Sequence, residues 1–247
     1  MAPQDPIRLF GLGLGPGDPD YMTVRARKVL ENADRLVHFC KRGRRGNART
    51  IADAVVGPNP DREIALVYPV TTEIPADHAD YAAALNPFYE EAAVRLLAEV
   101  EAGRVVAVLC EGDPFFYGSF MHLWWRLKDR IPIEVVPAVT AMSGAWTRAG
   151  APITWGDDVL TVLPGTLDEA ALVQRLSGTD AAVIMKLGSN FPKVRRAIEA
   201  AGLIERAIYV ERGTMAGERV LPLAETAPDE PAPYFSLICV PGRGRRP

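Results

Sequence analysis

The chain has 247 residues, of which 48% are hydrophobic and 24% are charged, a composition typical of a globular protein with one large or two smaller domains. Its net charge of −3 at pH 7 gives no overall positive field to attract nucleic acid. The three cysteines are widely spaced and form none of the short pairs that hold zinc. No apolar run approaches the ~18 residues needed to cross a bilayer, and no signal peptide is visible. We therefore expect a cytoplasmic protein without membrane segments.

Strand-like and helix-like patterns alternate through the first half of the chain. Asn86-Pro87 is expected to begin a helix that Gly103 ends, because asparagine caps helices and proline suits the first turn. The other expected strands are 7–12, 36–39, 64–67, 105–109 and 133–136, and the other expected helices are 23–32 and 119–130. This alternation predicts an α/β domain whose mostly parallel sheet carries helices on both faces.

The second half has a different arrangement of elements. Its expected strands are 159–163, 181–185, 207–210 and 235–240, and two helices, 168–176 and 192–201, lie between them. We expect a second α/β domain with a mixed sheet. The boundary is placed near Thr140, which predicts domains of residues 1–140 and 141–247.

The most informative stretch is 105–120, VVAVLCEGDPFFYGSF. Its five apolar residues indicate a strand buried on both faces, and the following Gly and Pro indicate a turn. In parallel sheets, ligands bind beyond the carboxyl ends of the strands. The turn after this strand is therefore a candidate ligand site.

A second glycine-rich turn, GLGLGPGDPD at 11–20, follows the first strand. A dinucleotide fingerprint starting at Gly11 or Gly13 needs a glycine at 16 or 18, but Pro16 and Asp18 stand there. This spacing argues against an oxidoreductase with a nicotinamide cofactor. Taken alone, the turn is equally consistent with a plain strand-to-helix connection.

Five sequence blocks in order resemble the tetrapyrrole (corrin/porphyrin) methylase family. They are GLGPGDPD, CEGDPFFYGS, VPAVTA, AVIMKLG and YVERGTM, and together they span nearly the whole chain. The resemblance implies two α/β domains with the ligand cleft between them and a homodimer. It also implies methyl transfer from S-adenosylmethionine to a tetrapyrrole, with S-adenosylhomocysteine as product.

The same resemblance implies which residues contact the methyl donor. They are Pro16, Glu111, Gly112, Asp113, Phe116, Thr140, Ala141, Leu187 and Gly213. The residue types suit a sulfonium, whose positive charge is lost during transfer. Both glycine turns lack lysine and arginine, and glycine lets backbone groups approach a ligand closely.

Methyl transfer to carbon needs little acid–base chemistry, although a proton must leave the methylated carbon afterwards. Glu111 and Tyr117 are the candidate catalytic groups, with His122 as a further candidate base. The substrate class carries many carboxylates, which arginine binds well. The stretch 41–49 (KRGRRGNAR) is therefore either a solvated loop or a mobile basic flap over the acidic substrate. The candidate substrate contacts are Arg42, Arg44, Arg45 and Tyr68. No spacing of residues suggests a metal site.

Other functions stay open at this point. Some members of the family methylate RNA or protein side chains, but RNA binding favours a broad basic surface, and the charge here is acidic overall. A non-catalytic ligand-binding module is also consistent with the sequence. Whether the tetrapyrrole carries cobalt is not settled, although the lack of a metal-handling cluster favours the metal-free form.

Overall fold

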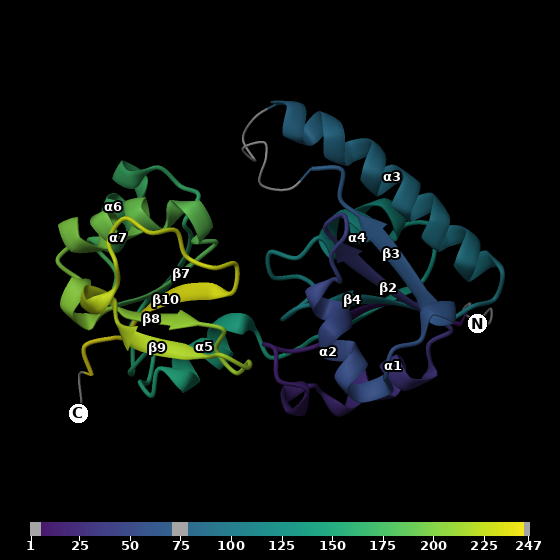
Figure 1. The fold of residues 1–247 in the computed structure, drawn as a ribbon, viewed down its shortest axis with the longest axis horizontal. Helices are drawn as coiled ribbons and strands as arrows, with labels where there is room; N and C mark the ends of the chain where they lie inside the picture. The colour runs from purple at the N-terminus through teal and green to yellow at the C-terminus, as the bar shows by residue number, and fades with distance from the viewer. Residues whose placement is uncertain (1–5, 71–78, 245–247) are drawn as a thin grey trace. The chain divides into compact units, whose positions relative to one another are not determined.

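The computed structural model describes residues 6–70 and 79–244. The chain divides into two compact units, residues 1–140 and 141–247 (Figure 1). Each unit is built around its own sheet, with helices packed on it, so each is described separately below.

Unit 1 contains a five-stranded sheet of order β3-β2-β4-β1-β5, in which every neighbouring pair is parallel. Its strands are β1 (Leu9–Gly13), β2 (Arg35–Cys40), β3 (Glu63–Val67), β4 (Val106–Cys110) and β5 (Ile133–Val136). Its helices are α1 (Val24–Asn32), α2 (Asn47–Val56), α3 (Ala79–Glu101) and α4 (Phe120–Leu127), with 3₁₀ turns η1 (Pro19–Tyr21) and η2 (Pro60–Arg62). The predicted parallel sheet is confirmed.

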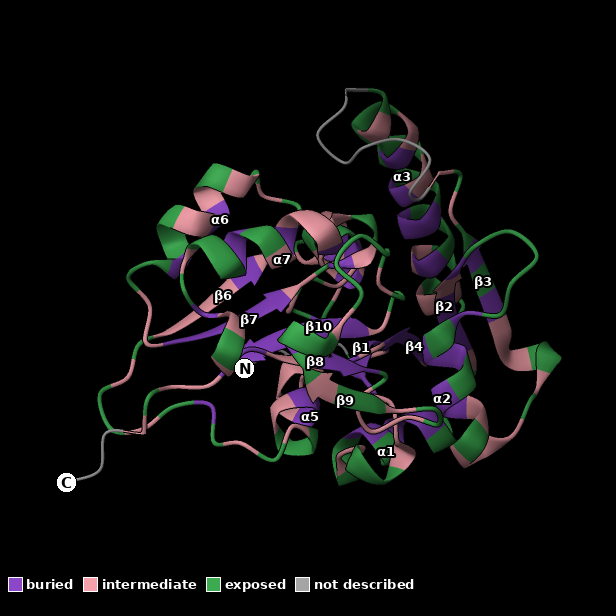
Figure 2. Ribbon diagram, turned by 60° about the vertical axis from the view of Figure 1, so that its left-hand side comes forward, coloured by how far each residue is buried: buried purple, intermediate pink, exposed green. Residues whose placement is uncertain are grey.

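Helices cover both faces of this sheet. One core joins α3 and α4 to the sheet through residues such as Leu96 and Phe120, and the other joins α1 and α2 through residues such as Leu30 and Ile51. All five residues of β4 are buried, as the apolar run predicts, and Figure 2 shows the central strands as buried. Because helices occupy both faces, we expect ligands to bind at the carboxyl ends of the strands.

The predicted helix start at Asn86-Pro87 is wrong. Pro87 lies inside α3, although an interior proline removes a hydrogen bond and crowds the preceding turn. The apolar face of the helix continues across the proline, because Leu85, Tyr89 and Leu96 are all buried against the sheet. Packing of this face outweighs the local preference of proline for a helix end.

The expectation that 41–49 forms one loop is also wrong, because α2 begins at Asn47. The sequence carried a signal for this helix. Ala48, Ile51 and Ala52, which are buried in the structure, have helical spacing, and Gly57, with φ of 71°, ends the helix. The loop is thus limited to residues 41–46.

Unit 2 contains a mixed sheet of order β6-β7-β10-β8-β9, as predicted. Only β6 and β7 pair in parallel; the other pairs are antiparallel. The strands are β6 (Leu160–Pro164), β7 (Ala181–Met185), β8 (Ile208–Glu211), β9 (Arg219–Pro222) and β10 (Ser236–Val240). The helices are α5 (Ala141–Arg148), α6 (Glu169–Leu176) and α7 (Phe191–Ala200), with 3₁₀ turns η3 (Gly188–Asn190), η4 (Ile204–Arg206) and η5 (Leu223–Glu225).

The sheet of unit 2 also has helices on both faces. Helices α6 and α7 pack on one face through Leu172 and Val194, and α5 packs on the other through Ala145. Strand β9 was not predicted, because this edge strand is short and mostly exposed and so lacks a buried apolar run. The sequence patterns found the buried elements of this unit and missed its exposed edge.

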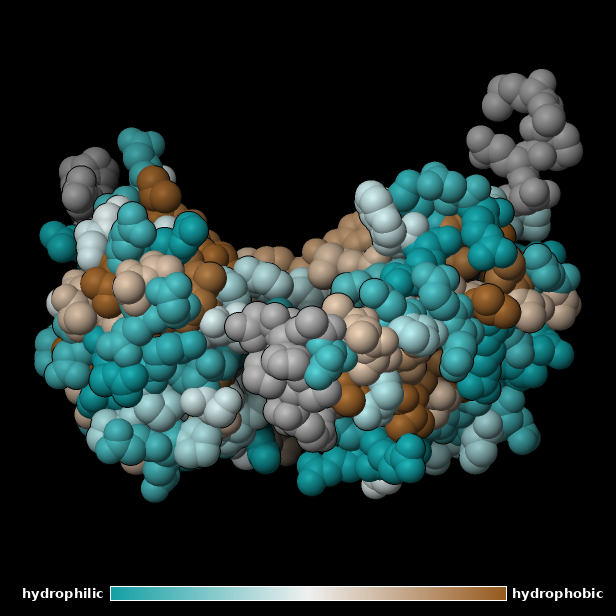
Figure 3. All heavy atoms as spheres, turned by 90° about the horizontal axis from the view of Figure 1, so that it is seen from above, coloured by the Kyte–Doolittle hydropathy of each residue, from teal (hydrophilic) through white to brown (hydrophobic). Residues whose placement is uncertain are grey.

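The three cysteines, Cys40, Cys110 and Cys239, are free and buried. Burial raises the pKa of the Cys40 thiol, with a smaller contribution from Glu63, and burial raises the pKa of Cys239 to about 12. Among the described helices, none is both long and apolar enough to cross a membrane. On the face shown in Figure 3, most of the described surface is hydrophilic, with apolar residues in separate groups.

Candidate active site

Three turns of unit 1 lie at one edge of the sheet. Strands β4, β1 and β5 are parallel neighbours, so the turns that follow them share the carboxyl edge. These turns carry most of the predicted donor contacts. The residues are Pro16 after β1; Glu111, Gly112, Asp113 and Phe116 after β4; and Thr140 after β5.

The turns after β1 and β4 are hydrogen-bonded to each other. Leu14 N donates to Cys110 O at 3.0 Å, and Gly112 N donates to Gly15 O at 2.8 Å. Gly15 and Gly112 have φ of 87° and 65°, a backbone conformation that residues with a side chain rarely adopt. The glycines therefore allow the two turns to pair directly through their main chains.

The turn after β5 is attached to this pair through Asp113. Its carboxylate accepts hydrogen bonds from Phe115 N at 2.9 Å and from Ala138 N at 3.1 Å. Gly13 allows the close approach, because a Cβ there would lie 2.6 Å from Ala138 Cβ and 2.9 Å from Gly112 O. Asp113 and Gly13 thus hold the three turns together.

Glu111, a predicted donor contact and candidate base, points its carboxyl group at helix α2. Glu111 Oε1 accepts a hydrogen bond from Ala48 N at 3.1 Å, and the Asn47 side chain also hydrogen-bonds the carboxylate. Burial raises the pKa of Glu111 to about 7, and the hydrogen bonds from Ala48 and Asn47 only partly oppose this rise. Both protonation states are consequently populated near neutral pH, as a general base requires.

Tyr117, the other catalytic candidate, has φ of 56°, and the residue is 41% exposed. Its ring lies 4.8 Å from the ring of the predicted donor contact Phe116. Among the described residues, the other non-glycine residues with positive φ are Lys186, Arg212 and Thr214. All four follow the carboxyl ends of strands β4, β7 or β8, and such strain is typical of functional loops.

The predicted substrate residues lie near the carboxyl end of β2. The Tyr68 and Ser119 hydroxyl oxygens are 2.5 Å apart, and the Tyr68 ring stacks on Phe39 at 5.4 Å. The contact with Ser119 connects Tyr68 to the turn after β4. Arg42 and Arg44 are exposed and so can reach an acidic ligand.

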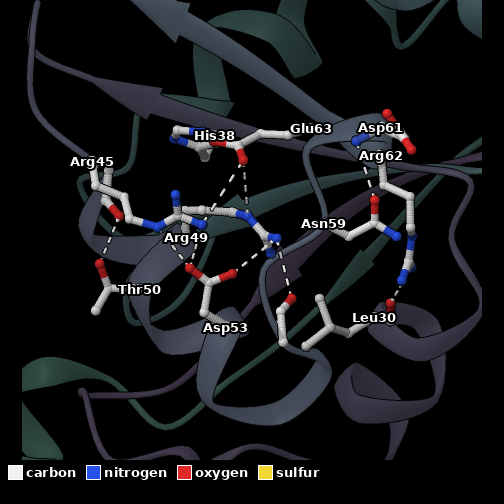
Figure 4. A network of polar contacts seen from close by, with 12 residues as sticks. Leu30, His38, Arg45, Arg49, Thr50, Asp53, Asn59, Asp61, Arg62 and Glu63 are labelled. Atoms are coloured by element: carbon white, nitrogen blue, oxygen red, sulfur yellow. Dashed lines mark hydrogen bonds and ion pairs between the residues drawn. The ribbon is translucent and has the colours of Figure 1, made fainter.

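Arg45 differs from these two arginines, because its Nε atom donates to Asp53 Oδ2 of α2 at 2.6 Å (Figure 4). It belongs to a polar network that the sequence did not reveal. Arg49 is fully buried and forms ion pairs with Asp53 at 2.9 Å and with Glu63 at 3.6 Å. His38 is 2% exposed and contacts Glu63 Oε1 at 2.7 Å.

Glu63 is ionised in this network. Burial alone would raise its pKa, but the hydrogen bond with His38 and the charges of Arg45 and Arg49 outweigh burial and lower the pKa. Together these contacts fix α2 against β2 and β3. Figure 4 shows the chain of contacts running from His38 to Asp53.

In unit 2, the predicted contacts Leu187 and Gly213 follow β7 and β8, and Ala141 begins α5. Both strands are antiparallel to β10, so their carboxyl ends share one edge of the sheet. The Leu187 side chain is buried in the core, so its main chain is the part near this edge. A Cβ on Gly213 would lie 3.1 Å from Val210 Cγ1 and 3.4 Å from Ala145 Cα, which makes this loop tightly packed.

A sequence profile of the tetrapyrrole (corrin/porphyrin) methylases matches residues 8–227. The chain belongs to this family. It is 54% identical to a precorrin-2 C(20)-methyltransferase from Sinorhizobium sp, over 97% of both chains. It is 33% identical to a cobalt-precorrin-2 C(20)-methyltransferase from Salmonella typhimurium, covering 94% of this chain and 95% of that one.

Solved structures of other tetrapyrrole methylases share the fold. A cobalt precorrin-4 methyltransferase, CbiF, superposes with a TM-score of 0.69 at 23% identity, over 94% of both chains. A uroporphyrin-III C-methyltransferase from Thermus thermophilus, complexed with S-adenyl homocysteine, has a TM-score of 0.63 at 22% identity, over 94% of this chain and 96% of that one. At these identities the similarity establishes two α/β domains of the methylase type.

The described part of this methylase contains no group of three or more His, Cys, Asp or Glu side chains arranged to hold a metal ion. The residues that sequence reasoning missed, Arg49, Asp53 and Glu63, support α2 rather than line a turn. The helical spacing of 48–56 was a signal for α2, which carries Arg49 and Asp53, but not for their contact with Glu63 of β3.

Proposed function

We propose that this protein transfers a methyl group from S-adenosylmethionine to C-20 of precorrin-2, giving precorrin-3A, in cobalamin biosynthesis. The observation that carries the proposal is the 54% identity, over 97% of both chains, to the Sinorhizobium relative named for that reaction. The blocks CEGDPFFYGSF, DDVLTVLPGTL, VIMKLG and PYFS of this sequence resemble that member of the family.

The turns after β1 and β4, which we call the donor turns, suit a sulfonium nucleoside as ligand. Residues 11–20 and 110–120 contain no lysine or arginine, and main-chain groups line the paired turns at Gly15 and Gly112. When bound, the donor supplies an electrophilic methyl group. The protein's task is to hold this methyl group in line with the nucleophilic carbon, and such alignment contributes up to ~7–11 kcal/mol in favourable cases.

The exposed guanidinium groups of Arg42 and Arg44 suit the carboxylates of the tetrapyrrole, because arginine pairs with carboxylates in a bidentate manner. Tyr68 lies in the same region, because its N–H donates to Cys40 O at the end of β2 at 3.0 Å. After transfer, a proton leaves C-20, and Glu111 or Tyr117 is the proposed acceptor. The raised pKa of Glu111, about 7, supports this role.

The alternative substrate is the cobalt complex of precorrin-2. The relative named for that substrate is 33% identical, against 54% for the relative named for the metal-free one. The difference in identity favours the metal-free substrate. A reaction with each form, under the same conditions, separates the two.

The decisive experiment incubates the purified protein with precorrin-2 and S-adenosylmethionine carrying a ¹³C-methyl group. We expect one added methyl group by mass, located at C-20 by NMR, and S-adenosylhomocysteine as co-product. A methyl group at another carbon, or turnover of the cobalt complex alone, would contradict the proposal. Binding of S-adenosylhomocysteine without any turnover would indicate a ligand-binding module, and binding of NADH instead would indicate an oxidoreductase.

We further propose that the protein works as a homodimer in the cytoplasm. The homodimer follows from the family resemblance, and the free, buried cysteines suit a reducing compartment. Sedimentation equilibrium tests the assembly, because a dimer has twice the 26.9 kDa mass of the chain. Cell fractionation tests the location.

A further inference from the structure

Helix α2 begins without a cap of its own. Its N-cap residue, Gly46, makes no side-chain hydrogen bond. A Cβ at this position would lie 2.4 Å from both His38 Nδ1 and Phe39 O, so the residue has to be glycine. The serine, threonine, asparagine or aspartate that normally caps a helix is therefore excluded here.

Glu111 takes the place of the missing cap. Its Oε1 atom accepts the hydrogen bond of Ala48 N at 3.1 Å, and Ala48 is the second residue of α2, where a capping side chain normally binds. The Asn47 side chain hydrogen-bonds the same carboxylate. A carboxylate at this end of a helix also interacts favourably with the helix dipole.

Hydrogen bonds of the two residues after Glu111 hold its main chain in the turn after β4. The next residue, Gly112, donates its N–H to Gly15 O at 2.8 Å, and the residue after that, Asp113, accepts from Ala138 N. A shift of these turns on binding a ligand therefore moves the main chain that carries the Glu111 carboxyl group.

The helix that Glu111 caps is directly preceded by the loop 41–46, which holds the exposed Arg42 and Arg44. The end of this loop is attached to α2, because Arg45 contacts Asp53 at 2.6 Å. The first turn of α2 thus sets where the loop ends. A loop anchored in this way loses less conformational entropy when it binds a ligand.

We propose that Glu111 is a positioning residue that caps α2 from the donor turn and so couples donor binding to the order of loop 41–46. The coupling prepares the arginines of the loop for the acidic tetrapyrrole only when the donor is in place. The inference rests on the proposed function for the identity of the two ligands and deepens it. Of the two proposed proton acceptors it leaves Tyr117, because it assigns Glu111 a positioning role.

The test compares wild type, Glu111→Gln and Glu111→Ala by hydrogen–deuterium exchange of the α2 amides, with and without S-adenosylhomocysteine. Loss of a helix cap corresponds to about a fivefold change in local opening. We expect the ligand to slow exchange at Ala48–Thr50 in wild type, the glutamine variant to retain most of this protection because it keeps an acceptor oxygen, and the alanine variant to lose it. Equal protection in wild type and Glu111→Ala would overturn the proposal.

Steady-state kinetics give a second readout. We expect Glu111→Ala to raise KM for the tetrapyrrole by about fivefold and Glu111→Gln to restore it. A loss of kcat by ~10²-fold or more in Glu111→Gln, with unchanged KM, would instead make Glu111 a general base and overturn the positioning role.

A matched control removes an ordinary cap. Asp168 caps α6 in unit 2 by accepting from Ala171 N at 2.7 Å, and Asp168→Ala is expected to leave the response of α2 to the ligand unchanged. A double-mutant cycle between Asn47→Ala and Glu111→Ala measures the contact itself. If wild type fails to methylate precorrin-2 but the exchange experiment succeeds, the proposed substrate is wrong and the cap stands.

Discussion

The carboxylate of Asp113 lies 3.1 Å from Ala138 N, and this hydrogen bond joins the turn after β4 to the turn after β5. The two turns are not neighbours in the sheet, because β1 lies between their strands. One side chain thus bridges across the turn after β1. The geometry of all three turns depends on that bridge.

Asp113→Ala removes the acceptor for Phe115 N and Ala138 N. We expect the free energy of unfolding to fall by about 1–3 kcal/mol, because charged hydrogen bonds are lost, and the affinity for S-adenosylhomocysteine to fall by about tenfold or more. Urea denaturation and calorimetric titration measure the two effects. Asp129→Ala, at an 82% exposed side chain, serves as the control, and equal effects of the two changes would disprove the bridge.

Gly13→Ala places a methyl group 2.6 Å from Ala138 Cβ and 2.9 Å from Gly112 O. Because one of these neighbours is backbone, the turns must separate, and we expect a loss of stability of about 1–3 kcal/mol together with weaker donor binding. Gly178→Ala is a matched control, since nothing lies within 4 Å of a Cβ there. Thermal unfolding compares the two variants; similar melting temperatures would count against the close packing of the turns.

Replacing both Arg42 and Arg44 by alanine tests the basic loop. We expect KM for the tetrapyrrole to rise by about tenfold, because bidentate contacts to carboxylates are lost, while KM for the donor changes little. The pair Arg27→Ala and Lys28→Ala, at exposed positions of α1, removes the same charge elsewhere and is the control. Unchanged kinetics in the loop variant would show that loop 41–46 does not bind substrate.

The buried ion pair between Arg49 and Asp53 predicts an asymmetric effect of mutation. After Asp53→Ala, the fully buried Arg49 keeps, of its two ion pairs, only the one with Glu63 at 3.6 Å. We expect the free energy of unfolding to fall by about 3–5 kcal/mol. Arg49→Met, which removes the buried charge, should lower the free energy of unfolding by less than Asp53→Ala does. Glu31→Ala breaks the exposed pair with Arg27 and should change stability by less than about 1 kcal/mol. Urea denaturation decides the order of the three variants.

Glu111 makes stability depend on pH. Its folded pKa of about 7 lies above the unfolded value of ~4.3, so its contribution is full below about pH 4 and is lost as pH rises through 7. We expect the stability of wild type relative to Glu111→Gln to fall by about 2–3 kcal/mol between about pH 5 and pH 8. If the difference in free energy of unfolding between wild type and Glu111→Gln stays constant across this pH range, the carboxyl group is not buried.

Much of this fold was predictable, because buried strands have short apolar runs. The strands at 133–136 and 181–185 were found with the correct limits. The helix expected from residue 23 was also found, and the Thr23 side chain caps α1 by accepting from Ala26 N. In the candidate site, the glycine spacing excluded a dinucleotide loop, and the order of strands then placed the predicted turns of unit 1 at one edge.

The contacts between distant segments were not predictable. Nothing local to Glu111 indicates that it reaches Ala48, 63 positions away, and Pro87 gives the wrong signal because tertiary packing decides its helix. Similarly, a run of arginines does not reveal that Arg49 is buried while Arg42 and Arg44 are exposed. Which arginine faces solvent depends on where the helix begins.

The burial of all three native thiols has a practical consequence. Because burial raises the pKa of these cysteines and removes them from solvent, the native protein should react slowly with maleimide dyes. A single cysteine introduced in the loop 41–46 would then carry one fluorophore per chain. Its emission would report the motion of that loop during turnover, without removal of any wild-type residue from the core.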